Sequence, residues 1–238
     1  MEKFDLIVDL QSKLRNTLIL KRIPHINFYS STFNFNFCTN KKNYIKTNNL
    51  CKMTIENLEK FLNLKINYSP YNLSLISDKF KQEAKKLLPY SNYIGLSVTQ
   101  GNLYRKKSWP MYNFVELAKK LNDKNKIPVF FIEKENRDLI NDIKSKVPQA
   151  LFPEDDSSIS CPALVTALSA RLEKAISIDN GVMHMMSLSG VPMIVLFGPT
   201  NSKKFAPDQK NVKILDSKVL YNDNEIKRIT INDVLKII

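Results

Sequence analysis

The sequence is poor in cysteine, histidine and glycine: its 238 residues include 3 Cys, 2 His and 5 Gly. Cys38, Cys51 and Cys161 lie far apart without CxxC spacing. They therefore indicate neither a disulfide framework nor a zinc site, and they suit a reducing cytoplasm. Two histidines cannot build a metal cage, and no Asp-x-Asp pair is present to hold a divalent cation. The sequence thus predicts no metal site.

Several familiar motifs are also missing. Neither GxGxxG nor GxxxxGK[ST] occurs, which excludes the Rossmann dinucleotide fingerprint and the P-loop. No stretch approaches the roughly 20 apolar residues of a membrane helix, because Pro192 and Gly198 bracket the most apolar run. The start, "MEKFDLIVDLQ", carries Glu2 and Asp5 and no small-residue cleavage site. We therefore expect no secretory signal.

Positive charge is in excess: the formal net charge is +13, and only six of the 36 basic residues are arginine. Basic chains often bind phosphates. Here the lysines accompany abundant Asn and Ile, a composition that AT-rich coding DNA produces without any partner. The chain also lacks the arginine clusters with interleaved aromatics of a nucleic-acid groove. A protein that binds nucleic acid or an anionic membrane is the alternative. It predicts steep salt dependence and indifference to nucleotide sugars.

From residue 93 onward, short apolar runs alternate with amphipathic segments. Strands are predicted at 93–98, 127–132, 174–178 and 191–197. Helices are predicted between them and at the C-terminal end of the sequence, for example at 108–121, where Phe114, Leu117, Ala118 and Leu121 recur at helical spacing. Alternating strands and helices predict an α/β fold with a doubly wound, mainly parallel sheet.

The first 90 residues are organised differently. A strand is predicted at 4–10, with helices at 11–22, 54–64 and 76–88, whereas 28–49 loses periodicity. We place a domain boundary near residue 90, which divides the chain into an N-terminal domain, 1–90, and a C-terminal Rossmann-like domain, 91–238. The first part is too short for an α/β domain with both sheet faces covered.

Unusual residues follow three of the predicted strands. "TQGNLYRKKSWP" comes after 93–98, "DNGVMH" after 174–178 and "GPTNSKKFAP" after 191–197. Ligands of open parallel sheets bind at the carboxyl ends of the strands, near helix N-termini. Hydroxyls, glycines, lysines and one acid at that edge suit a phosphorylated ligand, a diphosphate in particular. Lysines and backbone amides would neutralise it, which points away from a metal-dependent mechanism.

Each of these residues also has a plain structural interpretation. Gly181 could serve a tight turn, Asp179 could cap the next helix and His184 could pair with a backbone group. Lys107 could be ordinary surface charge, and the segment from Gly198 to Thr200 could be a simple loop.

Taken in order, the segments resemble glycosyltransferase family 9, the heptosyltransferases of lipopolysaccharide core assembly. The motifs are the hydroxyl-bearing turn with Ser97 and Thr99, Lys107-Ser108-Trp109-Pro110, Asp179-Asn180-Gly181-Val182-Met183-His184, and Gly198-Pro199-Thr200 with Pro207. The only Trp falls on its motif position, and "FDLIVDLQSKLRN" resembles an N-terminal segment of the family. The resemblance covers about 93–207 and, less closely, 4–20.

The resemblance implies a GT-B fold, in which two Rossmann-like domains face each other across a cleft. It implies a transferase that moves a sugar, usually heptose from ADP-heptose, to a lipopolysaccharide core acceptor, with inversion and without metal or other cofactor. The implied partners are a nucleoside-diphosphate sugar and a lipid-linked saccharide, not nucleic acid. The implied location is the cytoplasm, at the inner face of the bacterial inner membrane.

The resemblance also assigns roles to residues. Lys107 and the Thr99 hydroxyl would hold the diphosphate, and Glu135 falls where the family often has an acid that binds the ribose. The remaining members of the implied substrate-binding set are Asp179, Asn180, Gly181, His184, Gly198 and Thr200.

The sequence departs from the family pattern at several positions. Asn180 replaces the usual Thr, Ser12 replaces a Gly, and Ile132 and Glu133 stand where glycines are usual. The family also carries a Gly-Asp motif and a strand–helix repeat before the "DLQ" strand, and the catalytic base is expected there. We therefore expect the N-terminal acceptor-side domain to be truncated and to lack that base.

Asp9 is a weaker candidate for the base, and a structural hydrogen bond is the favoured interpretation of this acid. If no base is supplied, the chain is a nucleotide-sugar-binding remnant without transfer activity.

Overall fold

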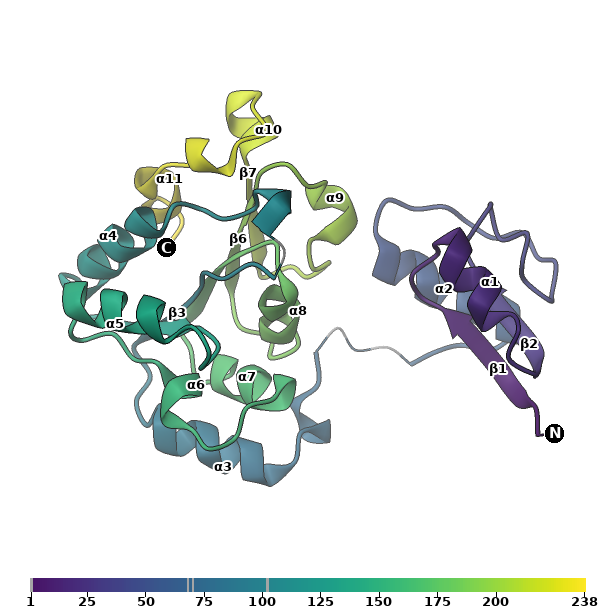
Figure 1. Cartoon of the computed structure of the whole chain (residues 1–238), viewed down its shortest axis with the longest axis horizontal. Coiled ribbons are helices and arrows are strands. Elements are labelled where there is room, and N and C mark those ends of the chain that lie inside the picture. Colours follow the sequence, from purple (N-terminus) through teal and green to yellow (C-terminus); the bar gives the residue numbers. More distant parts are fainter. Residues whose placement is uncertain (1, 68, 70, 102) are drawn as a thin grey trace. The chain divides into compact units, whose positions relative to one another are not determined.

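The computed structural model describes residues 2–67, 69, 71–101 and 103–238. The chain forms two compact units, Met1–Tyr68 and Ser69–Ile238 (Figure 1). This division falls before the boundary predicted near residue 90, because helix α3 (Asp78–Leu87) belongs with the second unit. Its Ala84 is buried against α7 (Pro162–Ser169), in one cluster with Leu164 and Leu168.

The second unit is built on a five-stranded parallel sheet in the order β4-β3-β5-β6-β7. Its strands are β3 (Tyr93–Ser97), β4 (Ile127–Phe131), β5 (Lys174–Ile178), β6 (Met193–Phe197) and β7 (Val212–Asp216). The first four are the predicted strands, and the parallel α/β fold is confirmed. β7 was not predicted: it lies at the edge of the sheet, and two of its five residues are exposed.

Helices cover both faces of this sheet (Figure 1). One face packs against α4 (Met111–Asn122), α5 (Arg137–Lys146) and α11 (Ile231–Leu235). The other packs against α3, α7 and α8 (Gly181–Ser187). Along β6, Ile194 and Leu196 enter the first core and Met193, Val195 and Phe197 the second. Burial on both faces explains why the strands read as unbroken apolar runs.

The remaining elements of the second unit are short. They are η1 (Leu73–Leu75), η2 (Leu103–Arg105), α6 (Pro153–Asp156), α9 (Ser202–Phe205), α10 (Ser217–Tyr221) and η3 (Ile226–Arg228). Trp109 is buried just before α4, and its indole Nε1 donates to the Ile229 carbonyl at 2.8 Å. None of the described helices has both the length and the apolar character that crossing a bilayer requires.

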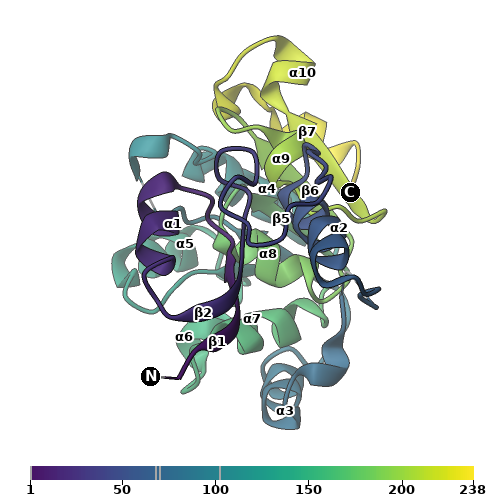
Figure 2. The same cartoon turned by 90° about the vertical axis from the view of Figure 1, so that its right-hand side faces the viewer.

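The first unit has two parallel strands, β1 (Phe4–Asp9) and β2 (His25–Ser30), and two helices, α1 (Leu14–Leu20) and α2 (Leu50–Leu62). The two helices lie on opposite sides of the strand pair (Figure 2). Tyr29, Phe35, Met53 and Phe61 form the core beneath α2. α2 begins four residues before the predicted helix, because Asn49 is its cap and accepts from the Lys52 amide.

β2 lies partly in the stretch where the sequence loses periodicity. Its last three residues, Phe28, Tyr29 and Ser30, are all buried, so polar and apolar residues do not alternate there. The strand is specified by its pairing with β1, from Phe4 opposite His25 to Asp9 opposite Ser30.

Candidate functional site

A pocket of about 440 Å³ opens at the carboxyl ends of β3, β5 and β6. Ligands bind at this edge of open parallel sheets. Six residues that the sequence predicted for a site line the pocket: Lys107, Asp179, Asn180, Gly181, His184 and Thr200. Gln100, Gly101, Arg105 and Phe205 complete the lining. All ten belong to the second unit.

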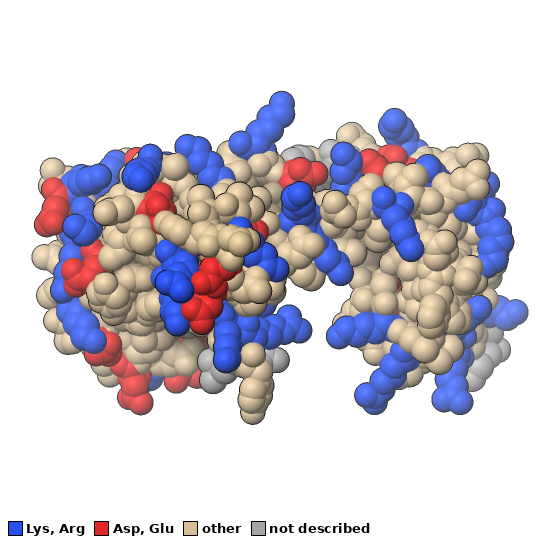
Figure 3. All heavy atoms as spheres, turned by 90° about the horizontal axis from the view of Figure 1, so that it is seen from above, with Lys and Arg blue, Asp and Glu red and all other residues tan. Residues whose placement is uncertain are grey.

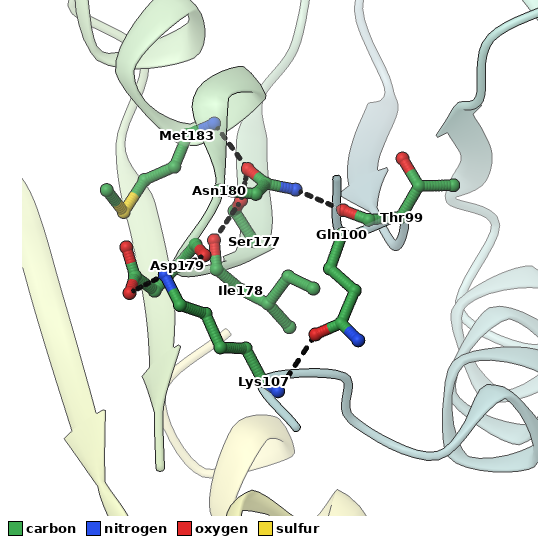
Figure 4. Close-up of polar contacts among 8 residues, drawn as sticks. All are labelled: Thr99, Gln100, Lys107, Ser177, Ile178, Asp179, Asn180 and Met183. Carbon is green, nitrogen blue, oxygen red and sulfur yellow. Dashed lines mark hydrogen bonds and ion pairs between the residues drawn. The ribbon is translucent and has the colours of Figure 1, made fainter. Parts of the chain in front are cut away.

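Lys107 and Asp179 form a buried ion pair in this pocket. The Lys107 Nζ lies 2.5 Å from Oδ2 of Asp179 and 3.2 Å from the Asp179 carbonyl oxygen (Figure 4). Their side chains are only 12% and 8% exposed. Lys107 is therefore not ordinary surface charge, since its ammonium is directed to the end of β5.

The Asn180 side chain is fully engaged within the protein. Its Oδ1 accepts from the Met183 amide at 2.8 Å, which caps α8. Its Nδ2 donates to Oγ of Ser97 at 2.8 Å. It also donates to the Thr99 carbonyl at 2.8 Å (Figure 4). These bonds connect the ends of β3 and β5. They leave the carboxamide little capacity to bind a substrate directly.

Within the segment from Thr99 to Lys107, the Gln100 side chain is hydrogen-bonded to the backbone of Lys107. Oε1 of Gln100 accepts from the backbone N–H of Lys107 at 2.8 Å (Figure 4). Lys106 has a φ of 48°, in the left-handed region that non-glycine residues rarely adopt. The approach of Lys107 to the pocket is thus defined by specific contacts.

His184 lies in the last turn of the short helix α8 and lines the same pocket. Loss of hydration lowers the pKa of its imidazole; Asp179 acts in the opposite direction, and Lys107 lowers the pKa further. The ring is therefore neutral near pH 7, and an anion bound nearby would favour its protonated form.

The glycines and Thr200 differ in their surroundings. A Cβ on Gly181 would meet nothing within 4 Å, so this position leaves open space beside the pocket. A Cβ on Gly198 would lie 2.7 Å from Cβ of Ile226, so Gly198 is required for packing. The buried Thr200 Oγ1 has no hydrogen-bond partner among the described residues, and Thr200 lines the pocket.

Three predicted site residues lie outside this pocket: Thr99, Glu135 and Gly198. The Thr99 hydroxyl donates to Oε2 of Glu133 at 3.1 Å instead. Glu135 is exposed in the loop after β4. Burial raises the pKa of nearby Glu154 to about 7, and the charges of Glu133 and Glu135 contribute. This carboxyl group was not singled out from the sequence, because its burial depends on packing between distant segments.

Asp9, in the first unit, is 2% exposed and already bound by four donors. Its carboxylate accepts from Oγ1 of Thr17 at 2.5 Å and Oγ of Ser30 at 2.9 Å, and from the amides of Gln11 and Ser12. Burial alone would raise the pKa of Asp9, but these hydrogen bonds lower it overall. This environment favours a structural role, since a general base needs a higher proton affinity.

The substrate-binding set that the resemblance implies omits three polar or aromatic lining residues: Gln100, Arg105 and Phe205. Arg105 is exposed and makes no ion pair or hydrogen bond with any residue that the structure describes. The sequence had indicated it by another route, because Arg105 opens the basic run with Lys106 and Lys107 that follows the strand predicted at 93–98. Gln100 and Phe205 carry no such signal.

On the face drawn in Figure 3, positive charge does not form one continuous stripe. Lysine and arginine side chains are scattered over each unit on this face. This distribution agrees with a compositional origin for most of the lysines. Within the described ranges, no three His, Cys, Asp or Glu side chains gather in a way that could hold a metal ion.

Solved glycosyltransferase structures resemble the chain. A glycosyltransferase family 9 structure from Veillonella parvula DSM 2008 has a TM-score of 0.76 at 19% identity, covering 99% of this chain and 72% of its own. The E. coli heptosyltransferase WaaC with ADP has a TM-score of 0.74 at 17% sequence identity, and the match covers 99% of this chain and 72% of the WaaC chain. E. coli WaaC with ADP-2-deoxy-2-fluoro heptose has a TM-score of 0.73 at 18% sequence identity. The match covers 99% of this chain and 71% of the WaaC chain. These likenesses establish the GT-B-type fold.

The sequence also matches a family profile along nearly its whole length. The profile describes glycosyltransferase family 9 (heptosyltransferase) and matches residues 1–235. No curated protein matches the chain. Because the profile spans both units and the motifs at its pocket are those of the family, the chain belongs to glycosyltransferase family 9 and has the heptosyltransferase fold.

Proposed function

We propose that this glycosyltransferase transfers a heptose from an ADP-linked donor to a saccharide acceptor of the lipopolysaccharide core type. The observation that carries the proposal is the pocket at the sheet edge, where Lys107, Arg105 and His184 converge. Its volume of about 440 Å³ lies in the range of small-molecule sites. One structural relative, WaaC, was solved both with ADP and with ADP-2-deoxy-2-fluoro heptose, which supports an ADP-linked donor.

In the proposed reaction, the acceptor hydroxyl attacks the anomeric carbon of the donor and gives its proton to a general base, which a longer chain or a partner would supply. The bond from that carbon to the β-phosphate oxygen breaks, and ADP leaves with the electron pair. Displacement from the opposite side inverts the anomeric centre. The leaving diphosphate gains negative charge in the transition state, and fixed cations at that position lower the barrier.

Residues of the chain itself would provide the positive charge. Lys107 is held at the end of β5 and Arg105 has no competing partner among the described residues. We therefore assign diphosphate binding to these two side chains and propose that transfer is metal-independent. Thr200 offers an uncommitted hydroxyl to the same ligand.

The acceptor would be lipid-linked, and we propose that the enzyme acts in the cytoplasm at the inner face of the inner membrane. This location follows from the lipid-linked acceptor and not from the lysine excess, most of which we attribute to composition. Sedimentation with vesicles of anionic lipid, compared with neutral ones, tests this part separately from donor binding.

The first experiment is calorimetric titration of the purified chain with ADP, UDP and GDP at moderate salt. We expect selective ADP binding, and we expect Lys107→Ala to weaken it by about 1.5–3 kcal/mol, the scale of a hydrogen bond to a charged group. Lys120→Ala is the matched control, because Lys120 is exposed on α4, away from the pocket.

Two results would contradict the proposal. One is equal ADP binding by the Lys107→Ala variant and the parent, which would remove Lys107 from the diphosphate site. The other is a folded chain that ignores all three nucleotides but binds nucleic acid with steep salt dependence, which would favour the alternative class.

A further inference from the structure

Lys107 is part of a closed ring of contacts, which joins the segment from Thr99 to Lys107 to the end of β5. Starting at Asp179, the chain passes to Asn180, whose Nδ2 donates to the Thr99 carbonyl. The next residue, Gln100, accepts from the Lys107 amide, and the Lys107 ammonium returns to Asp179. Three non-covalent links and two peptide bonds thus close the ring, which Figure 4 draws in full.

Each link restricts a different part of Lys107. The bond to Gln100 fixes the backbone of Lys107, directly after the left-handed Lys106. The Asn180 bond fixes the base of the segment, at the end of β3. Asp179 fixes the ammonium. Without the first two links, the segment from Thr99 to Lys107 would lose contacts that limit where the ammonium can lie.

We propose that Gln100 and Asn180 are positioning residues, which hold Lys107 for the diphosphate without supplying its principal contacts. The inference rests on the proposed function, since it takes the diphosphate as the ligand of Lys107. For Asn180 it replaces direct substrate binding, the role predicted from the sequence, with an indirect one. Gln100 acquires a role that the sequence motif did not assign.

The chemistry of the two side chains supports this division. The Asn180 carboxamide uses both its oxygen and its nitrogen on Met183, Ser97 and Thr99. The Gln100 carboxamide oxygen accepts from the backbone N–H of Lys107. A carboxamide oxygen cannot bind a phosphate oxygen, because both are acceptors. Through this oxygen, Gln100 can act on the anion only by way of the Lys107 backbone that it positions.

The test is a double-mutant cycle on ADP binding. Gln100→Met keeps the length of the side chain and removes the acceptor. Asn180→Thr keeps an oxygen for the α8 cap and removes the donor to Thr99. We expect each to weaken ADP binding about five- to tenfold, the range of one lost hydrogen bond. In a Lys107→Ala background, neither should weaken it further, because a residue that acts through Lys107 has nothing left to position.

Gln82→Met is the matched control, since Gln82 is exposed on α3. Equal loss of ADP affinity with and without Lys107 would overturn the proposal, as would parent-like affinity in both variants. Circular dichroism and the melting temperature establish that each variant is folded.

A second measurement does not depend on ADP. Amide hydrogen exchange at Lys107, followed by NMR, should be about tenfold faster in Gln100→Met than in the parent, because this amide loses its acceptor. Unchanged exchange would overturn the positioning role even if ADP binds. If the Lys107 amide exchanges faster in Gln100→Met but the parent does not bind ADP, the link between Gln100 and Lys107 is supported and the proposed ADP-linked donor is rejected.

Discussion

The ammonium of Lys107 lies 2.5 Å from a carboxylate oxygen of Asp179, although the two residues are 72 positions apart in the sequence. The sequence pattern suggested that both would bind the donor. The geometry adds that they bind each other, so a phosphate must compete with Asp179 for Lys107 or share it.

This competition leads to a prediction for Asp179→Asn. The change keeps the shape of the side chain and removes its charge, so we expect ADP to bind several-fold more tightly than to the parent. The same change leaves a buried ammonium without its counter-charge and should lower the free energy of unfolding by about 3 kcal/mol. Calorimetry and urea unfolding measure the two effects. Weaker ADP binding in a folded variant would mean that Asp179 contacts the donor favourably.

Two glycines of the family motifs should respond differently to alanine. Gly198→Ala places a Cβ 2.7 Å from Cβ of Ile226 and 2.8 Å from its backbone nitrogen, and should destabilise the protein by about 1–3 kcal/mol. Gly181→Ala meets open space, and any loss of ADP affinity there would reflect the ligand rather than the fold. Melting temperatures of the two variants check this directly. Equal destabilisation would contradict the packing difference.

Thr200→Val should leave the protein as stable as the parent or slightly more stable. Its buried hydroxyl oxygen has no partner among the described residues, and removing an unsatisfied polar group of the same shape is neutral or favourable. If the hydroxyl serves the donor, ADP binding should weaken about two- to tenfold. Thermal unfolding with and without ADP separates the two effects. A clear loss of stability without ADP would show that the hydroxyl is needed by the fold.

His184 should take up protons when ADP binds. Its pKa is lowered by loss of hydration, so the ring is neutral near pH 7, and the added negative charge shifts it toward the protonated form. Titrations at pH 6.5 in buffers of different ionisation enthalpy measure the proton number. The parent should take up more protons than His184→Gln. Identical proton numbers would place His184 outside the field of the diphosphate.

Glu154 should make stability depend on pH. Its pKa rises from 4.5 to about 7 on folding, so between these values the folded state binds more protons than the unfolded state. Stability must then fall as the pH rises through that range, and the loss is complete above pH 7. Glu154→Gln should remove the penalty and add about 2–3 kcal/mol at pH 8 relative to pH 4. Urea unfolding of the parent and Glu154→Gln at pH 4 and pH 8 measures this difference. An equal gain in the free energy of unfolding at both pH values would contradict an origin in the ionisation of Glu154.

The sequence by itself determined the parallel α/β fold, four of the five strands of the large sheet and the family. Met193 to Phe197 form an unbroken apolar run because their side chains enter two cores. Such a run is local, so it can be recognised as a buried strand without coordinates. The motif order also placed six residues at one pocket, because the carboxyl ends of parallel strands meet at one edge.

Only the tertiary structure decided what each side chain does there. In the structure, the Thr99 hydroxyl donates to Glu133, and the Asn180 side chain links the ends of β3 and β5. Glu154 is buried near Glu133 and Glu135; burial raises its pKa, and the charges of these two acids raise it further. The tertiary structure also paired β2 with β1 and joined α3 to the second unit. These outcomes depend on contacts between segments distant in sequence, whose distances and burial no local periodicity encodes.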